Sequence, residues 1–151
     1  MKYFQDYFKK GLIKAQRPNF RQIEKQIARA AKDLHTFDLV IDKDPEWASA
    51  IAYQAMLRMG RALLFSHGFL PVDGQQHKTV VEITGKILGP EFGLIIKQFD
   101  RLRKKRNVFF YDSEDSHNFT EAGKAMSTAR QLLGEIKKRI VSLSPQYTFK
   151  F

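Results

Sequence analysis

The apolar residues of every long segment recur at the 3.6-residue period of an α-helix, and no segment shows the sustained alternation that is typical of a β-strand. This period predicts an all-α fold, a helical bundle of four to five long helices plus a short N-terminal helix. At 151 residues, 43% of them apolar, the chain is long enough for one domain with a substantial core. We expect a single domain over residues 1–151, with its core at about 20–143, an accessory helix in 1–18 and a tail at 145–151.

Polar capping residues and prolines mark where the helices begin. Asn19 is a favourable N-cap residue, Asp44 precedes a proline at the first helical position, and Asn118 has a glutamate three residues later, as in a capping box. Residues 69–75 carry proline and glycine turn signals, which predict a loop and a candidate mobile rim. The predicted helices span residues 3–16, about 19–41, 44–67, 77–88, 91–112 and 118–143.

Two of these helices have distinctive apolar residues. The helix over 44–67 is rich in alanine, which allows close approach of neighbouring backbones, and larger side chains that include Trp47 should fill the core around it. The helix over 3–16 carries an aromatic ridge flanked by lysines. That ridge suits either a membrane surface or the bundle itself, and packing against the bundle is the favoured interpretation.

Composition limits the partners and the chemistry. Lys and Arg number 26 against 16 acids, a net charge of +10, and such a balance favours RNA, DNA or another polyanion. The chain has no cysteine, and its four histidines lack metal-ligand spacing, so we expect no disulfide, no metal site and no cofactor. It has no apolar run of about 18 residues and no signal-peptide core. We therefore expect a cytoplasmic protein that does not use a membrane.

The densest positive charge lies in residues 100–112, and one arginine there interrupts an apolar stripe. At about 100° per residue, Arg106 falls in the middle of a sector that is otherwise apolar. A guanidinium stays charged and its burial is costly, so this position calls for a buried partner, a dimer seam or an anionic ligand. Asn107 and Tyr111 lie together on the flank of the same helix. The stripe comprises Ile95, Phe99, Leu102, Phe109 and Phe110.

Each of these residues also has a structural interpretation. Arg106 would be structural if it paired inside the bundle, or across a dimer with Asp100 or Asp112 of another copy. Separately, the basic residues at 101 and 103–105 would form only a solvated face. His77, at the start of a predicted helix, suits a capping or surface role. Asp112 closes a helix end and secondarily orients Tyr111 or Arg106. These alternatives remain open on sequence grounds.

Residues 52–68, 76–82 and 103–112 together resemble the HEPN superfamily, small helical bundles many of which act in RNA cleavage, toxin–antitoxin pairs and phage defence. The last segment, Arg-Lys-Lys-Arg-Asn-Val-Phe-Phe-Tyr-Asp, matches the signature of that superfamily: an arginine, a polar residue and, four residues on, a histidine. Arg106 and Asn107 fill the first two places, but Tyr111 replaces the histidine. The resemblance covers about residues 20–143.

The resemblance implies a homodimer that binds RNA or a nucleotide and has weakened or lost ribonuclease activity, because a phenol with a pKa of about 10 is a poor general base near neutrality. Arg106 and Tyr111 would stand at the catalytic positions, with Asp112 and His77 in support. The alternative is a non-catalytic interaction module, the partner of a nucleotidyltransferase or an antitoxin-like subunit. The predicted RNA- or nucleotide-binding residues are Arg103, Arg106, Asn107 and Tyr111.

Overall fold

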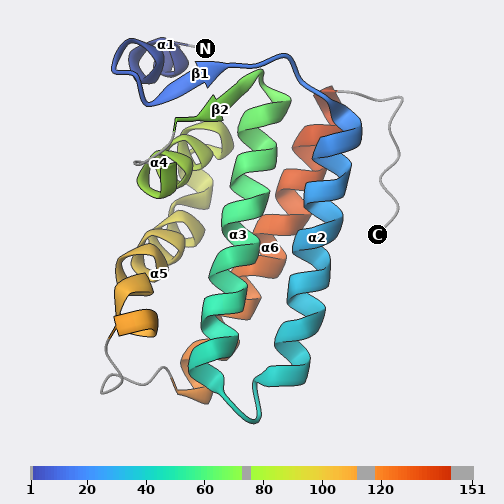
Figure 1. The fold of residues 1–151 in the computed structure, drawn as a ribbon, viewed down its shortest axis with the longest axis vertical. Helices are drawn as coiled ribbons and strands as arrows, with labels where there is room; N and C mark the ends of the chain where they lie inside the picture. Colours follow the sequence, from blue (N-terminus) through green and yellow to red (C-terminus); the bar gives the residue numbers. More distant parts are fainter. Residues whose placement is uncertain (1, 73–75, 112–117, 144–151) are drawn as a thin grey trace.

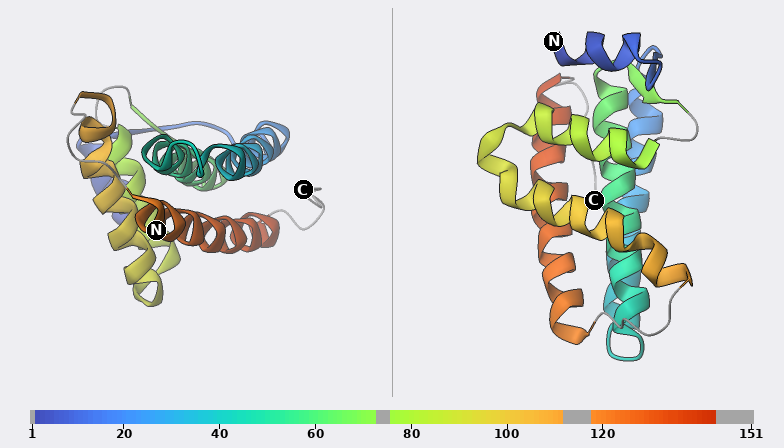
Figure 2. Two further views of the ribbon diagram at one scale, coloured as in Figure 1. Left: turned by 90° about the horizontal axis from the view of Figure 1, so that it is seen from below. Right: turned by 90° about the vertical axis from the view of Figure 1, so that its left-hand side faces the viewer.

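Helix α3 (Pro45–Ser66) runs through the middle of a helical bundle, and 15 of its 22 residues are buried. The computed structural model describes residues 2–72, 76–111 and 118–143, and of residues 76 and 106–111 it describes the backbone alone. Helices α2 (Phe20–Val40) and α6 (Phe119–Leu143) run alongside α3, whereas α4 (Gln76–Leu88) and α5 (Gly93–Tyr111) cross over one side of the bundle (Figure 1; Figure 2). The predicted all-α bundle is confirmed, and so is the central position of α3.

The three longest helices begin where their capping residues predicted. Each cap satisfies a backbone N–H that has no partner inside the helix. In each case the side-chain Oδ1 accepts a hydrogen bond from the N–H three residues later: Asn19 from Gln22 (3.1 Å), Asp44 from Trp47 (3.0 Å) and Asn118 from Glu121 (2.9 Å).

The N-terminal prediction was wrong in its secondary structure. Helix α1 covers Lys2–Lys9 instead of 3–16, and strand β1 (Ile13–Ala15) follows it. Gly11 has a φ of +71°, a conformation that ends the helix and that glycine adopts without strain. Strand β1 pairs antiparallel with β2 (Phe69–Pro71), which lies within the predicted loop 69–75. Residues 73–75 of that loop lie outside the described residues.

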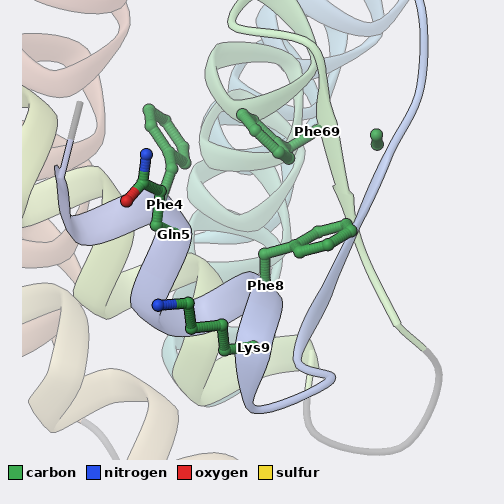
Figure 3. A pocket seen from close by; sticks show the side chains of 6 residues that line it. Phe4, Gln5, Phe8, Lys9 and Phe69 are labelled. Atoms are coloured by element: carbon green, nitrogen blue, oxygen red, sulfur yellow. The ribbon is translucent and has the colours of Figure 1, made fainter.

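The aromatic ridge of α1 docks on the bundle, as the favoured interpretation held. Phe4 is 4% exposed and its ring stacks on that of Phe69, with ring centroids 4.7 Å apart. Phe8 is largely exposed and helps to enclose a small apolar hollow with Phe4 and Phe69 (Figure 3). The Tyr7 hydroxyl donates to Glu82 Oε2 of α4 over 2.6 Å, and burial together with this hydrogen bond raises the pKa of Tyr7.

Two further findings concern the apolar residues of the helices. Trp47 was expected in the core but is 48% exposed, because it projects from the first turn of α3 about 100° round the helix from the buried Ala48. Within the described ranges, no helix combines the length and the apolar composition that crossing a membrane requires.

An arginine from α6 holds the corner between α4 and α5. Helix α4 ends at Leu88, a 3₁₀ turn (Pro90–Phe92) follows, and α5 starts at Gly93 rather than at the predicted 91. Arg139 donates through its two terminal nitrogens to the carbonyl oxygens of Ile87 and Leu88, each over 3.0 Å. The last carbonyls of a helix accept no hydrogen bond from within it, so the Arg139 guanidinium satisfies them and its positive charge stabilises the end of α4.

Helix α4 approaches the backbone of α3 closely at Gly60. A Cβ atom at this position would lie 2.5 Å from Val80 Cγ1 and 2.9 Å from Thr84 Oγ1, both on α4. Distances below about 3 Å are not tolerated by real side chains without displacement. The absence of a side chain at position 60 therefore sets the spacing between α3 and α4.

We predict that Gly60→Ala destabilises the protein by about 1–3 kcal/mol through overpacking, although alanine is intrinsically the better helix former by about 0.8–1 kcal/mol. Gly134→Ala in α6 is the matched control, because no atom lies within 4 Å of its Cβ position. This control should stabilise the protein by about 0.5–1 kcal/mol. Urea unfolding measures both, and stabilisation by both substitutions would show that the α3–α4 contact is not tight.

Candidate nucleic-acid interface

A shallow basic groove of about 530 Å³ runs between α4 and α5. Its charged side chains come from both helices, and four basic groups outnumber two carboxylates. Because basic side chains in a groove attract phosphates over a distance, this surface is suited to an anionic ligand. The charged lining consists of Lys78 and Glu82 from α4 and of Lys97, Asp100, Arg103 and Lys104 from α5.

Asp100 organises the α5 side of this groove. Arg103 Nε donates to Asp100 Oδ1 over 2.8 Å, and Lys104 Nζ lies 3.1 Å from Oδ2. Partial burial acts to raise the pKa of Asp100, but the hydrogen bonds from Arg103 and Lys104 outweigh it, and the pKa lies below the ordinary value. One ionised carboxylate thus holds two cations in place and leaves an excess of positive charge.

The basic surface continues around the outer side of α5. A second hollow, of about 610 Å³, shares Lys97, Asp100 and Lys104 with the groove and adds Arg101 and Lys105. Lys105 Nζ lies 3.5 Å from Glu121 of α6, whereas Arg101 is exposed and has no ion pair among the described residues. The cluster at 101–105 is therefore partly paired and partly free, instead of being a uniformly solvated face.

The predicted signature residues continue α5 beyond this surface. Phe99 and Leu102 are fully buried, so the apolar stripe faces the core as far as its side chains are described. Arg106 follows Leu102 by one helical turn, and Asn107 and Tyr111 complete the helix. Their side chains, and Asp112 as a whole, lie outside the described residues. The roles assigned to these four residues remain predictions.

His77 has a partner that the sequence did not suggest. Its Nδ1 shares a hydrogen bond of 2.8 Å with the hydroxyl of Tyr53 in α3, and the two rings lie 5.9 Å apart. The Tyr53 ring also packs against Phe99 of α5 at 5.9 Å. His77 therefore joins α4 to α3, which differs from the capping or surface role that the sequence favoured. The sequence offers one signal for this contact. Tyr53 lies in the alanine-rich helix α3, and the hydroxyl of a buried tyrosine needs a hydrogen-bond partner.

Comparison with known proteins identifies one family. The family model for the HEPN domain matches residues 23–140, which run from the first turn of α2 almost to the end of α6. Comparison with curated proteins gives no match. The matched region contains the α4–α5 groove and the stretch with Arg106, Asn107 and Tyr111, and it covers well over half of the chain. The chain therefore belongs to the HEPN domain family.

Proposed function

We propose that this protein binds RNA or a nucleotide along the basic groove between α4 and α5, and that it cleaves RNA poorly or not at all. Membership in the HEPN domain family supports a role related to nucleotides, RNA or RNA cleavage. The observation that carries the proposal is the groove itself, which Lys78, Lys97, Arg103 and Lys104 line together with only two acids, Glu82 and Asp100. We place this activity in the cytoplasm, in a process of the toxin or phage-defence type.

Binding in this proposal depends on phosphate contacts along α5. Basic side chains release counterions when they neutralise phosphates, which makes binding strongly dependent on salt. Arg106 would pair with one phosphate through its planar fork, and Asn107 would add amide hydrogen bonds. Tyr111 would stack on a base or hydrogen bond to it. Arg103 would extend the binding surface, while Asp112 and His77 would support it.

A homodimer is the second part of the proposal. Arg106 follows two fully buried residues, Phe99 and Leu102, on the same stripe of α5. An arginine in such a position is satisfied more easily at a wet seam between two copies than in a closed core. HEPN domains often form dimers, which agrees with this arrangement.

We predict that light scattering at high micromolar concentration gives the mass of a dimer, with α5 near the two-fold axis. Arg106→Glu should shift the mass towards a monomer, because the substituted glutamates of the two copies would lie close together at the two-fold seam and repel each other. The exposed Arg101→Glu is the matched control and should leave the dimer intact. A monomer for the unmodified protein would overturn this part of the proposal.

For RNA binding, we predict that Arg106→Ala weakens affinity for a single-stranded oligonucleotide by about tenfold or more, since a charge-assisted hydrogen bond contributes about 1.5–3 kcal/mol. Arg101→Ala removes the same side chain from an exposed position of the same helix and should cost only about two- to threefold. Fluorescence anisotropy across a salt series measures both affinities. The slope of log affinity against log salt should fall by about 1 for Arg106→Ala.

The same titration distinguishes the rival function, a non-catalytic partner of a nucleotidyltransferase or an antitoxin-like subunit. Leu94 favours this rival, since it is 85% exposed at the edge of the basic surface. Undetectable RNA binding at low salt, together with a stable complex with a second protein that Leu94→Asp abolishes, would replace our proposal with the rival.

For cleavage, we predict little or no activity in the unmodified protein and a gain of about 10²–10⁴-fold for Tyr111→His, the usual contribution of general acid–base catalysis. Histidine supplies a group with a pKa of about 6.5 that accepts and returns a proton near neutrality. A metal-free assay with labelled RNA at pH 7 measures the rate. Efficient cleavage by the unmodified protein that Tyr111→Phe leaves unchanged would contradict the prediction, because the proton transfer would then belong to another residue.

A further inference from the structure

A second basic pocket lies between α2 and α3, and it shares no lining residue with the α4–α5 groove. Figure 1 shows these two helices side by side, with β2 close to one end of α3. The pocket has a volume of about 400 Å³, within the range of small-molecule sites. Its polar lining comprises Gln22, Lys25, Gln26, Arg58 and Arg61, and its apolar lining comprises Ala62, Phe65 and Leu70.

The positive charge of Arg58 is only partly neutralised, because Arg58 shares its acidic partner with a second arginine. Its Nε lies 3.0 Å from Asp33 Oδ2, but Asp33 Oδ1 also lies 3.2 Å from Arg29 Nε, so one carboxylate serves two guanidinium groups. Arg58 Nε and Asp33 Oδ2 are both buried, and neither has a hydrogen-bond partner, so this close approach is an ion pair without a hydrogen bond. The terminal nitrogens of Arg58 donate to no group among the residues with described side chains.

Arg61 is the stronger indication of a ligand. Burial lowers the pKa of its guanidinium; Tyr53 acts to raise this pKa, and the like charge of Arg58 acts to lower it. In the part of the chain whose side chains are described, Arg61 has neither an ion pair nor a hydrogen bond. A half-buried guanidinium that cannot lose its proton gains free energy when an anion replaces its lost hydration.

The shape and the donors of the pocket define the anion. Two guanidinium forks one helical turn apart match the several oxygens of a phosphate, and the amides of Gln22 and Gln26 add further donors. Phe65 and Ala62, both buried, form an apolar wall beside these donors. We propose that the α2–α3 pocket is a second binding site, which takes a phosphate monoester attached to a flat or apolar body.

This inference does not rest on RNA binding in the α4–α5 groove. A monoester carries about 1.5–2 negative charges at neutral pH, more than the single charge of a phosphate inside an RNA strand, and therefore suits two arginines. A free mononucleotide and the 5′-phosphate end of a strand share this chemistry. The two sources are separated by experiment.

The test uses the full chain and calorimetric titration with the four ribonucleoside 5′-monophosphates, with adenosine and inorganic phosphate as partial ligands. At least one monophosphate should bind about tenfold or more tightly than either partial ligand, since both halves of the pocket contribute. Arg61→Gln should reduce that affinity about tenfold or more. Lys138→Gln, which removes one exposed positive charge from α6 outside both basic surfaces, is the matched control and should leave it unchanged.

Oligonucleotides with a 5′-phosphate or a 5′-hydroxyl identify the source of the monoester. A preference for the phosphorylated strand that Arg61→Gln removes assigns the pocket to strand ends, whereas no preference assigns it to free nucleotides. Arg61→Gln should leave binding of the 5′-hydroxyl strand intact, so a failure of this proposal is distinguishable from a failure of RNA binding in the α4–α5 groove. If Arg61→Gln does not fold, the exposed Lys25→Gln replaces it, with a smaller expected loss of about threefold.

Two results would overturn the proposal. The first is that no monophosphate and no phosphorylated strand binds more tightly than its dephosphorylated counterpart. The second is that Arg61→Gln lowers the affinity no more than Lys138→Gln does, because the attraction would then come from overall charge instead of a built site.

Discussion

The close contact of α4 with α3 at Gly60 sets the position of α4 on the bundle, and the basic groove lies along that helix. With no side chain at position 60, Val80 and Thr84 reach the backbone of α3, and α4 crosses the bundle at a short spacing. Arg139 then binds the last carbonyls of α4, so that α5 starts from a fixed corner. The two walls of the basic groove are α4 and α5, so the α3–α4 contact and the Arg139 corner set the positions of the helices that form it.

One electrostatic arrangement occurs twice in the molecule. Asp100 lies between Arg103 and Lys104 in the α4–α5 groove, and Asp33 lies between Arg29 and Arg58 beside the α2–α3 pocket. A single carboxylate positions two cations in each case but neutralises only one of them. Shared carboxylates of this kind reduce the repulsion among neighbouring cations while they preserve a local excess of positive charge.

The sequence predicted what depends on neighbouring residues and missed what depends on distant ones. The starts of α2, α3 and α6 follow from hydrogen bonds that span three residues, as at Asn118, and such bonds are visible in a local pattern. The pairing of β1 with β2 joins segments more than 50 residues apart, and no local period encodes it. The contact of Tyr53 with His77 spans 24 residues and was missed for the same reason. The stripe through Phe99 and Leu102 was predicted because burial on one helix face does leave a periodic signal.

The position of His77 bears on whether this chain can cleave RNA by itself. A general base must lie within about 3 Å of the proton that it accepts, directly or through one water. His77 is held by Tyr53, whose ring packs on Phe99, and Phe99 precedes Arg106 by seven residues, about 10.5 Å along a helix. The hydrogen bond with Tyr53 occupies Nδ1 of His77, so a proton transfer by His77 would use its other ring nitrogen, Nε2. Because the tyrosine at position 111 is a poor general base near neutrality, we expect efficient cleavage to need proton transfer by another group, either His77 or a group from a second copy or a partner.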